Sequence, residues 1–446
     1  MGATALMVVL AVLSLAASSS AQLRYGFYKS KCNSSDVEAV VQSIVKARFA
    51  REAPIVAYLL RLQFHECAVN GCDGGLLIDG PGTEKTAAPN LSVKGYDLIA
   101  TIKTELERRC PGVVCSDIEI LATRDAVALA GGPAYAVRTG RRDRRRSVAS
   151  DVRLPGAGYT AAQTVSYFSG LGMSAYDTVV LLGAHTVGAT HCSVIKSSRL
   201  YSYGGKAGAT DPSMDPVLAS VYKKYVCPNV ASSDGNAVFL DDQWSALKVD
   251  NHYYRNLQLR RGVLSCDQNL YSDASTERII DQLASNNGLF QSTFGQVLVK
   301  LSEVNVLTGA QGEIRKVEQA KSRIMGRRKA GATDPSMDPV LASVYKKYVC
   351  PNVASSDGNA VFLDDQWSAL KVDNHYYRNL QLRRGVLSCD QNLYNDASTK
   401  RIIDQLASNN GLFQSAFGQV LVKLSEVNVL LTGTQGEIRK VCNKFN

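Results

Sequence analysis

The chain has 446 residues, 45% of them hydrophobic and 20% charged, with a formal net charge of +10. This length and composition support a sizeable core and leave room for more than one domain. After residue 21 no segment has eighteen uninterrupted apolar residues, which excludes a membrane-spanning helix from the rest of the chain.

Residues 1–21 have the pattern of a signal peptide. The apolar run MVVLAVLSLAA is followed by the small residues SSSA, although no Lys or Arg precedes the run. The run is too short to anchor a membrane protein, so we expect cleavage after Ala21 and a soluble, secreted protein. The eleven cysteines then predict disulfides, and Asn33-Ser34-Ser35 is a glycosylation sequon.

Two helices are predicted at the start of the mature chain. Ser35 and Glu38 form a capping box before an amphipathic run that ends near Arg51. Pro54 suits the first turn of the second helix. A loop rich in Gly, Pro and Asn follows at 71–93.

Four more helices are predicted, at 95–109, 116–130, 160–171 and 174–182. The second of them should begin at a capping box of Ser116 and Glu119, and the fourth at Ser174 and Asp177. His185 then lies at the C-terminal end of the fourth helix. Strand-like alternation is scarce, so the predicted fold class is mainly α.

The stretch 59–77, LLRLQFHECAVNGCDGGLL, carries the most reactive side chains. Arg61 and His65 are four residues apart and share one face of the predicted helix. A guanidinium beside a titratable imidazole suits proton transfer to a group on which negative charge develops. From these residues alone two other interpretations stay open. His65 is a structural histidine, or it joins Cys67 and Cys72 in a zinc site, for which no second ligand pair lies nearby.

Two segments resemble the signature motifs of one family, the plant secretory (class III) haem peroxidases. RLQFHECAVNGCDGGLL is similar to that family's distal haem motif, and DTVVLLGAHTVGATHC, at 177–192, is similar to its proximal haem-ligand motif. The resemblance implies a haem-peroxidase fold, in which distal and proximal helical halves sandwich haem b. It also implies reduction of hydrogen peroxide through high-valent iron–oxo intermediates, with one-electron oxidation of small phenolic donors.

The resemblance assigns roles to individual residues. His185 matches the axial ligand of the iron, and Asp267, in LSCDQ, matches the carboxylate that pairs with this ligand. The duplicate Asp390 is equally qualified. On the distal side the imidazole would move a proton between the peroxide oxygens while the guanidinium stabilises the departing one. The matching distal residues are Arg61, Phe64, His65 and Asn90, and the proline at the substrate access is Pro155.

Two calcium sites are implied by the same resemblance. The distal site departs from the family pattern, because Glu66 stands where Asp is usual and Gly75 where Ser is usual. Both changes weaken a site that needs about six to eight oxygen ligands. At the proximal site Ser245 replaces the usual Thr. The matching ligands are Glu66, Val69, Gly71, Asp73 and Gly75 at the distal site, and Thr186, Asp242, Ser245 and Asp250 at the proximal site.

The C-terminal third of the chain is duplicated almost verbatim. The segment 206–317 recurs from Lys329, with few substitutions and one inserted Leu near 430–431. Only one copy can pack against the unique N-terminal two-thirds of the chain. Neither copy contains a haem-binding histidine, so the surplus copy cannot form a second active site. Either copy can dock, and the inserted Leu favours the first; a gene-model error stays open as the origin of the repeat. We predict a haem peroxidase domain at 22–317, a basic linker at 318–328 and the repeat at 329–446.

The disulfide framework of the family is matched with two departures. CPGVVC at 110–115 is one residue shorter than usual, and the last cysteine of the framework exists only in the second copy. Cys350 duplicates Cys227, while Cys266 and Cys389 are extra. The implied pairs are Cys32–Cys110, Cys67–Cys72, Cys192–Cys227 and Cys115–Cys442.

The sequence thus predicts a monomeric haem peroxidase, secreted from a plant cell to the extracellular space or wall and involved in the response to oxidative stress. Its partners would be hydrogen peroxide and small phenolic donors. The basic run GRRDRRRS at 140–147 favours acidic cell-wall polysaccharide over nucleic acid as a further partner, unless the run is only a solvated face. Two alternatives are a catalytically impaired basic wall glycoprotein with unstable haem loading, and a zinc-dependent hydrolase that uses His65.

Overall fold

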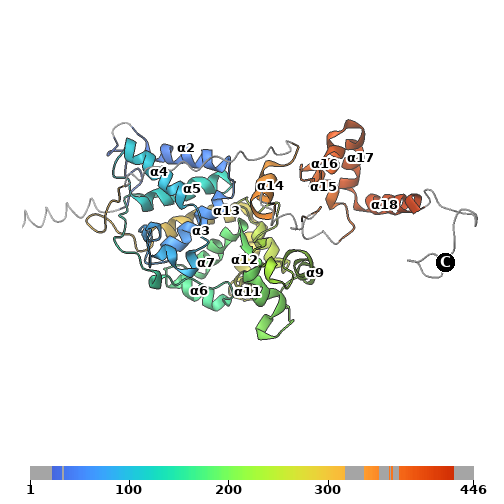
Figure 1. Cartoon of the computed structure of the whole chain (residues 1–446), viewed down its shortest axis with the longest axis horizontal. Coiled ribbons are helices and arrows are strands. Elements are labelled where there is room, and N and C mark those ends of the chain that lie inside the picture. The colour runs from blue at the N-terminus through green and yellow to red at the C-terminus, as the bar shows by residue number, and fades with distance from the viewer. Residues whose placement is uncertain are drawn as a thin grey trace, which may run out of the picture. The chain divides into compact units, whose positions relative to one another are not determined.

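The computed structural model describes residues 23–32, 35–316, 336–350, 361, 363–364 and 371–425 (Figure 1). The chain divides into two compact units. Unit 1 comprises Met1–Gly331 and Val340–Ala360, and unit 2 comprises Ala332–Pro339 and Val361–Asn446. The predicted signal peptide, the Asn33 sequon, the linker 318–328 and Cys442 lie outside the described residues.

Unit 1 is built from helices, which confirms the prediction of a mainly α fold. A small antiparallel sheet pairs β1 (Ala189–His191) with β2 (Ala237–Phe239). The α-helices are α2 (Val37–Phe49), α3 (Ile55–Cys67), α4 (Tyr96–Arg109), α5 (Cys115–Leu129), α6 (Ala161–Ser169), α7 (Ala175–Leu182), α8 (Cys192–Ile195), α9 (Pro216–Val221), α10 (His252–Gln258), α11 (Ser265–Tyr271), α12 (Glu277–Ser285), α13 (Asn287–Ser302) and α14 (Pro339–Val344).

Helix α7 begins at the predicted cap, whereas α2 begins at a different one. Ser174 and Asp177 form the predicted capping box at α7. At α2 the predicted cap, Ser35, is wrong. The carboxylate of Asp36 accepts the backbone N–H of Glu38 at 3.0 Å, so the helix begins one residue later.

The start of α5 is set by a residue from outside the helix. The prediction placed the cap at Ser116, but α5 begins at Cys115. The carboxylate of Asp143 accepts the backbone N–H groups of Cys115 and Ser116 at 3.1 and 3.0 Å. A carboxylate at a helix N-terminus satisfies otherwise unpaired amides and the positive end of the helix dipole. Tertiary structure therefore caps this helix, which no local motif could reveal.

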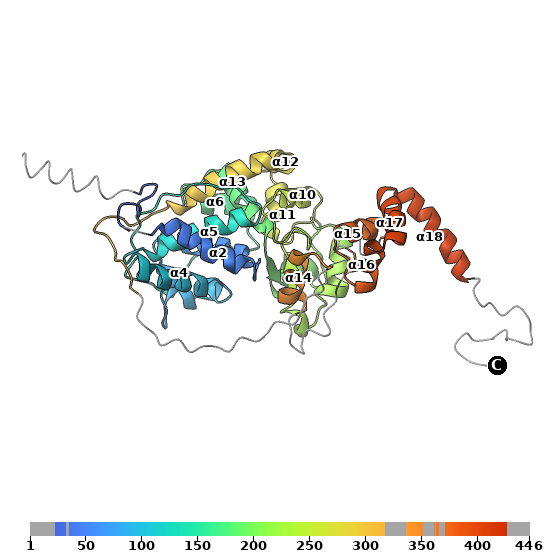
Figure 2. The ribbon, with the colours of Figure 1, turned by 90° about the horizontal axis from the view of Figure 1, so that it is seen from above.

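The helices α5 and α13 organise the core of unit 1. Helices α2, α3 and α4 pack on α5, and α13 packs against both α3 and α7 (Figures 1 and 2). The resulting apolar core spans both halves and includes Val41, Leu59, Leu121, Val180 and Phe290. Because α13 comes from the first copy of the repeat, it is this copy that joins the two halves.

A buried ion pair ties the segment after α5 to the core. Asp117 and Arg141 are fully buried, with 2.9 Å between Oδ1 and Nη1. The same carboxylate accepts the hydroxyl of Tyr28 at 2.7 Å and the backbone N–H of Gly140 at 2.8 Å. Buried charges persist only when paired and hydrogen-bonded in this way. Arg141 opens the basic run, so part of the run's charge is used inside the fold and does not form a solvated face.

A short segment of the second copy also belongs to unit 1 and packs against its first copy and N-terminal part. Lys347 pairs with Glu52 and lies 4.5 Å from the centre of the Tyr58 ring. Val344, in α14, is 1% exposed. It joins a small apolar cluster with Ala53, Phe239, Ala246 and Leu247.

Unit 2 consists of α15 (His375–Gln381), α16 (Ser388–Asn395), α17 (Ala397–Ser408) and α18 (Asn410–Ser425). Helix α18 repeats α13 with a single substitution, yet most of the apolar side chains described on it are exposed, with Phe413 as a buried exception. Phe417 and Leu421 are 39% and 48% exposed, whereas the equivalent Phe294 and Leu298 of α13 are 0% and 2% exposed. Among the helices described in either unit, none has the length and apolar character needed to cross a bilayer.

Candidate active site

The distal half of the candidate site is carried by α3. Arg61, Phe64 and His65 lie within five residues of this helix. The Nδ1 atom of His65 is 2.6 Å from Oδ1 of Asn90, and the amide of Asn90 donates to the backbone carbonyl of Glu84 at 2.8 Å. Since the Asn90 carbonyl can only accept, Nδ1 carries the proton and Nε2 is left as a free base.

The surroundings of His65 keep its imidazole neutral. Burial and the charge of Arg61 lower the pKa of His65 to about 4, although the hydrogen bond from Nδ1 to Asn90 opposes this shift. A neutral imidazole at physiological pH can accept a proton, as the first step of general acid–base catalysis requires.

The guanidinium of Arg61 is held in place from the loop that follows α3. Its Nη1 and Nη2 atoms donate to Ser92 Oγ and to the carbonyl of Pro89, both at 3.0 Å. Its charge helps to lower the pKa of His65 and opposes the rise in the pKa of His185, so the guanidinium lies within electrostatic range of both imidazoles. The structure thus brings His185 within electrostatic range of Arg61, which lies 124 positions earlier in the sequence (185 − 61).

Aromatic rings border the distal histidine. The Phe64 ring packs edge-on against His65, with 5.7 Å between the ring centres, and lies 5.6 Å from Phe168 of α6. The sequence did not point to Phe168. Pro155 lies half-buried in the segment before α6.

The proximal half of the site is centred on His185, in a 3₁₀ turn (Gly183–Thr186) directly after α7. Its Nδ1 atom is 2.9 Å from Oδ1 of Asp267, at the start of α11. Tyr253, which the sequence did not single out, donates its hydroxyl to the same oxygen at 3.0 Å. Asp267 is fully buried, whereas about a third of the His185 side chain (32%) is exposed. One ring nitrogen is therefore paired and the other is left for a ligand.

The carboxylate also sets the charge state of His185. Burial lowers the pKa of the imidazole, but the charge and hydrogen bond of Asp267 outweigh burial and raise it above its ordinary value. Asp390, the duplicate of Asp267, lies on α16 in unit 2. Of the two candidates that the sequence left open, the structure pairs His185 with Asp267.

The residues predicted for the proximal calcium site present several oxygens to one another. Thr186 Oγ1 is 3.1 Å from the carbonyl of Lys248 and 3.5 Å from Oδ1 of Asp250. Asp241, absent from the prediction, lies 3.2 Å from the same hydroxyl, while Asp242 Oδ1 accepts the N–H of Ser245 at 2.9 Å. Within the described residues no three His, Cys, Asp or Glu side chains are grouped as metal ligands. A cation here would depend on hydroxyl and main-chain oxygens as well, which suits calcium.

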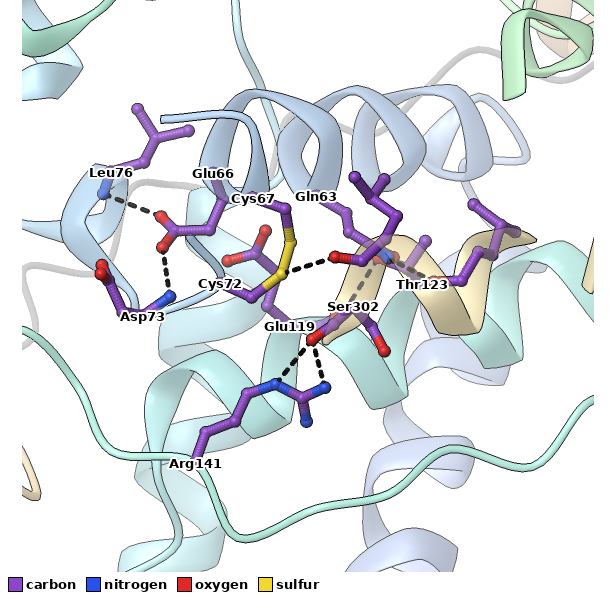
Figure 3. Close-up of a disulfide and its surroundings, with 12 residues drawn as sticks. Gln63, Glu66, Cys67, Cys72, Asp73, Leu76, Glu119, Thr123, Arg141 and Ser302 are labelled. Carbon is purple, nitrogen blue, oxygen red and sulfur yellow. Dashed lines mark hydrogen bonds between the residues drawn. A yellow bond between two sulfur atoms is a disulfide. The ribbon is translucent and has the colours of Figure 1, made fainter. Parts of the chain in front are cut away.

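The residues predicted for the distal calcium site are arranged differently. The carboxylate of Glu66 accepts the N–H groups of Asp73, Gly75 and Leu76 at 2.8–3.1 Å. Figure 3 shows the bonds from Asp73 and Leu76. Burial and neighbouring acids raise the pKa of Glu66 to about 8. Val69 and Gly71, whose carbonyls were the other predicted ligands, lie in the same loop.

Three disulfides are present among the described cysteines: Cys32–Cys110, Cys67–Cys72 and Cys192–Cys227. They are three of the four predicted pairs, and the fourth includes Cys442, outside the described residues. Cys115, Cys266 and Cys350 form no disulfide within the described part of the chain.

The protein is mainly helical, with a His–Asn pair and an arginine in the distal half of the candidate site and a His–Asp pair in the proximal half. This is the architecture of a haem peroxidase. Comparison with known proteins agrees, and the chain belongs to the peroxidase family. The family model described as Peroxidase matches residues 41–286 and 290–409. The family binds haem, acts on hydrogen peroxide and oxidises donor substrates.

Several plant peroxidases are similar over nearly their whole length. Peroxidase 57 of Arabidopsis thaliana is 47% identical over 297 residues, which cover 66% of this chain and 91% of the relative. Peroxidase 44 of the same plant is 44% identical over 307 residues, covering 68% and 94%. Peroxidase N1 of Nicotiana tabacum is 40% identical over 300 residues, covering 66% and 89%.

Proposed function

We propose that this peroxidase is a secreted enzyme that uses haem b, reduces hydrogen peroxide and oxidises small phenolic donors. The observation that carries the proposal is the pair of oriented histidines. In both, Nδ1 is engaged by a side chain, Asn90 for His65 and Asp267 for His185, which directs Nε2 of each ring to a ligand or a substrate.

Haem, when bound, would supply the redox chemistry that passes the oxidising equivalents of hydrogen peroxide to the donor. His185 would hold the haem iron through Nε2, and Asp267 would keep that ring oriented and increase its basicity. On the distal side, Nε2 of His65 takes a proton from the peroxide and returns it to the departing oxygen. The fixed guanidinium of Arg61 stabilises the negative charge on that oxygen. Phe64 and Pro155 would limit which donors approach.

Further parts of the proposal rest on the sequence and on the charge of the chain. The leader-like residues 1–21 support secretion, and the charge of +10 supports acidic wall polysaccharide as a partner. Arg145 and Arg146 are 73% and 60% exposed and would carry that contact. A monomer with one calcium at the proximal site, and a fourth disulfide, Cys115–Cys442, complete the proposal.

The proposal is tested by absorption spectroscopy of the mature protein reconstituted with haem. We expect a Soret band that shifts on addition of hydrogen peroxide and returns when a phenol is added, together with iron in a metal assay. A protein that folds but shows no Soret band would instead be the impaired wall glycoprotein. Zinc in place of iron would indicate a hydrolase.

The pH dependence of the reaction with peroxide provides a second test. Because the pKa of His65 is lowered to about 4, its imidazole is neutral above that pH and protonated below it. We expect the second-order rate constant to be level at neutral pH and to fall as the pH drops through about 4. Arg61→Leu removes a charge that lowers this pKa, so the fall should move to higher pH. A fall centred at the ordinary histidine value in the unchanged protein would contradict the assignment.

A further inference from the structure

The loop that follows α3 is held by protein groups at the place where the family resemblance implies a calcium ion. The side chains of Glu66 and Asp73 were the two charged ligands expected there. Both are already engaged, one by backbone amides and the other by a guanidinium. The arrangement of donors around these oxygens decides whether a cation fits.

Glu66 is one methylene longer than the usual Asp, and its carboxylate reaches into the loop. Oε1 accepts the N–H groups of Asp73 and Gly75 at 3.0 and 3.1 Å, and Oε2 accepts that of Leu76 at 2.8 Å. The disulfide Cys67–Cys72 closes the same loop. Both carboxylate oxygens of the fully buried Glu66 side chain are therefore bound to N–H donors of the loop itself.

Arginines supply the positive charge. Arg144 donates from Nε to Asp73 Oδ2 at 2.5 Å and from Nη2 to the carbonyl of Asn70 at 3.2 Å. Arg315 donates from Nη1 to the carbonyl of Gly74 at 2.6 Å and also binds the carbonyl of Arg144. Two guanidiniums carry the same formal charge as one calcium ion, and their forked geometry serves several oxygens at once.

Space in the loop is taken as well. A Cβ atom at Gly75 would meet Glu84 Oε1 at 2.8 Å, and one at Gly74 would meet Asp143 Oδ1 at 2.8 Å and Arg315 Nη1 at 3.1 Å. A serine at position 75, as in the family pattern, would therefore require the Glu84 side chain to shift. By contrast, no guanidinium contacts the oxygens around Thr186 in the hydrogen bonds of the described residues.

We propose that a clamp of Glu66, Arg144 and Arg315 replaces the distal calcium ion in this protein, which then binds calcium only at the proximal site. The inference rests on the proposed function, since both calcium sites come from the peroxidase resemblance. The clamp acts on the catalytic histidine through a short path. The loop leads to Glu84, whose carbonyl binds Asn90, and Asn90 holds Nδ1 of His65. Glu66, Arg144 and Arg315 are thus positioning residues.

The test is the calcium content of the haem-loaded protein, measured by mass spectrometry after equilibration with calcium and gel filtration. We expect one calcium per chain, and none in Asp250→Asn. The acids Glu84 and Glu119 also face this loop, so a second ion is the competing result. Two calcium ions per chain would overturn the inference, as would a single ion that survives Asp250→Asn and is lost in Asp73→Asn.

A double variant, Glu66→Asp with Arg144→Ser, restores the usual Asp and removes one guanidinium of the clamp. It should raise the content from one calcium to two, because it frees Asp73 and shortens the carboxylate that fills the loop. Arg142→Ser is the matched control. Arg142 belongs to the same basic run but donates from Nε to the carbonyl of Gln311 at 3.3 Å, outside the clamp, so the calcium content should not change. If the protein without substitutions contained no calcium, the proximal site would be refuted and the clamp would remain supported. The two proposals therefore fail separately.

Discussion

Replacing His65 by alanine should lower the rate constant for the reaction with hydrogen peroxide by about 10²–10⁴-fold, the usual contribution of a positioned acid–base group. The imidazole is a neutral base within electrostatic range of Arg61, and its proton is fixed on Nδ1 by Asn90 at 2.6 Å. Without it, the peroxide proton has no positioned acceptor, and the charge-stabilising guanidinium acts alone. Stopped-flow absorbance of the Soret band measures this step directly.

The control for this substitution is available within the chain. His375→Ala removes a histidine of the second copy, which lies in unit 2, and should leave the rate constant unchanged. The Soret intensity of His65→Ala should match that of the unchanged protein, which separates loss of the base from loss of haem. A rate constant within twofold of the unchanged value would exclude His65 as the proton acceptor.

The duplication supplies an even closer comparison for the proximal carboxylate. Asp267→Asn should cost about 10–100-fold in haem affinity or activity, as removal of a partner of a metal-ligating histidine commonly does. The same substitution at Asp390 should have no effect. Both residues stand in the sequence LSCDQ, but only Asp267 is buried against His185, at 2.9 Å.

If Asp267 had only a structural role, the Asp267→Asn substitution would lower the stability of the protein and change nothing else. The assay therefore includes the reduction potential of the iron, which should rise in Asp267→Asn because an amide is a weaker acceptor than a carboxylate and leaves His185 less basic. Tyr253 can still donate to the new amide oxygen, which limits disruption of the core. Equal effects of the two substitutions, or an unchanged potential, would contradict the pairing.

The fate of the basic run shows how far charge alone can be interpreted. As a sequence, GRRDRRRS suggested a surface for a polyanion or a solvated face. In the fold Arg141 is fully buried against Asp117, and Arg144 is bound to Asp73. Partners far away in the sequence decided this, since a carboxylate within reach makes burial of a guanidinium tolerable. Arg145 and Arg146 remain exposed.

The sequence by itself determined the features that depend on neighbours a few residues apart. It placed Arg61 and His65 on one helical face, capped α7 with Ser174 and Asp177, and gave two motifs long enough to point to haem peroxidases. Spacing along a helix is a local property, so these inferences needed no knowledge of the rest of the chain.

Only the tertiary structure decided between the two copies of the repeat. The near-identical helices α13 and α18 have the same local propensities, yet Phe294 is buried and Phe417 is 39% exposed. Likewise Asp267 meets His185 while Asp390 lies in unit 2. Burial and hydrogen bonding depend on which surface a segment meets, and two copies of one sequence cannot both fill a single place in the core.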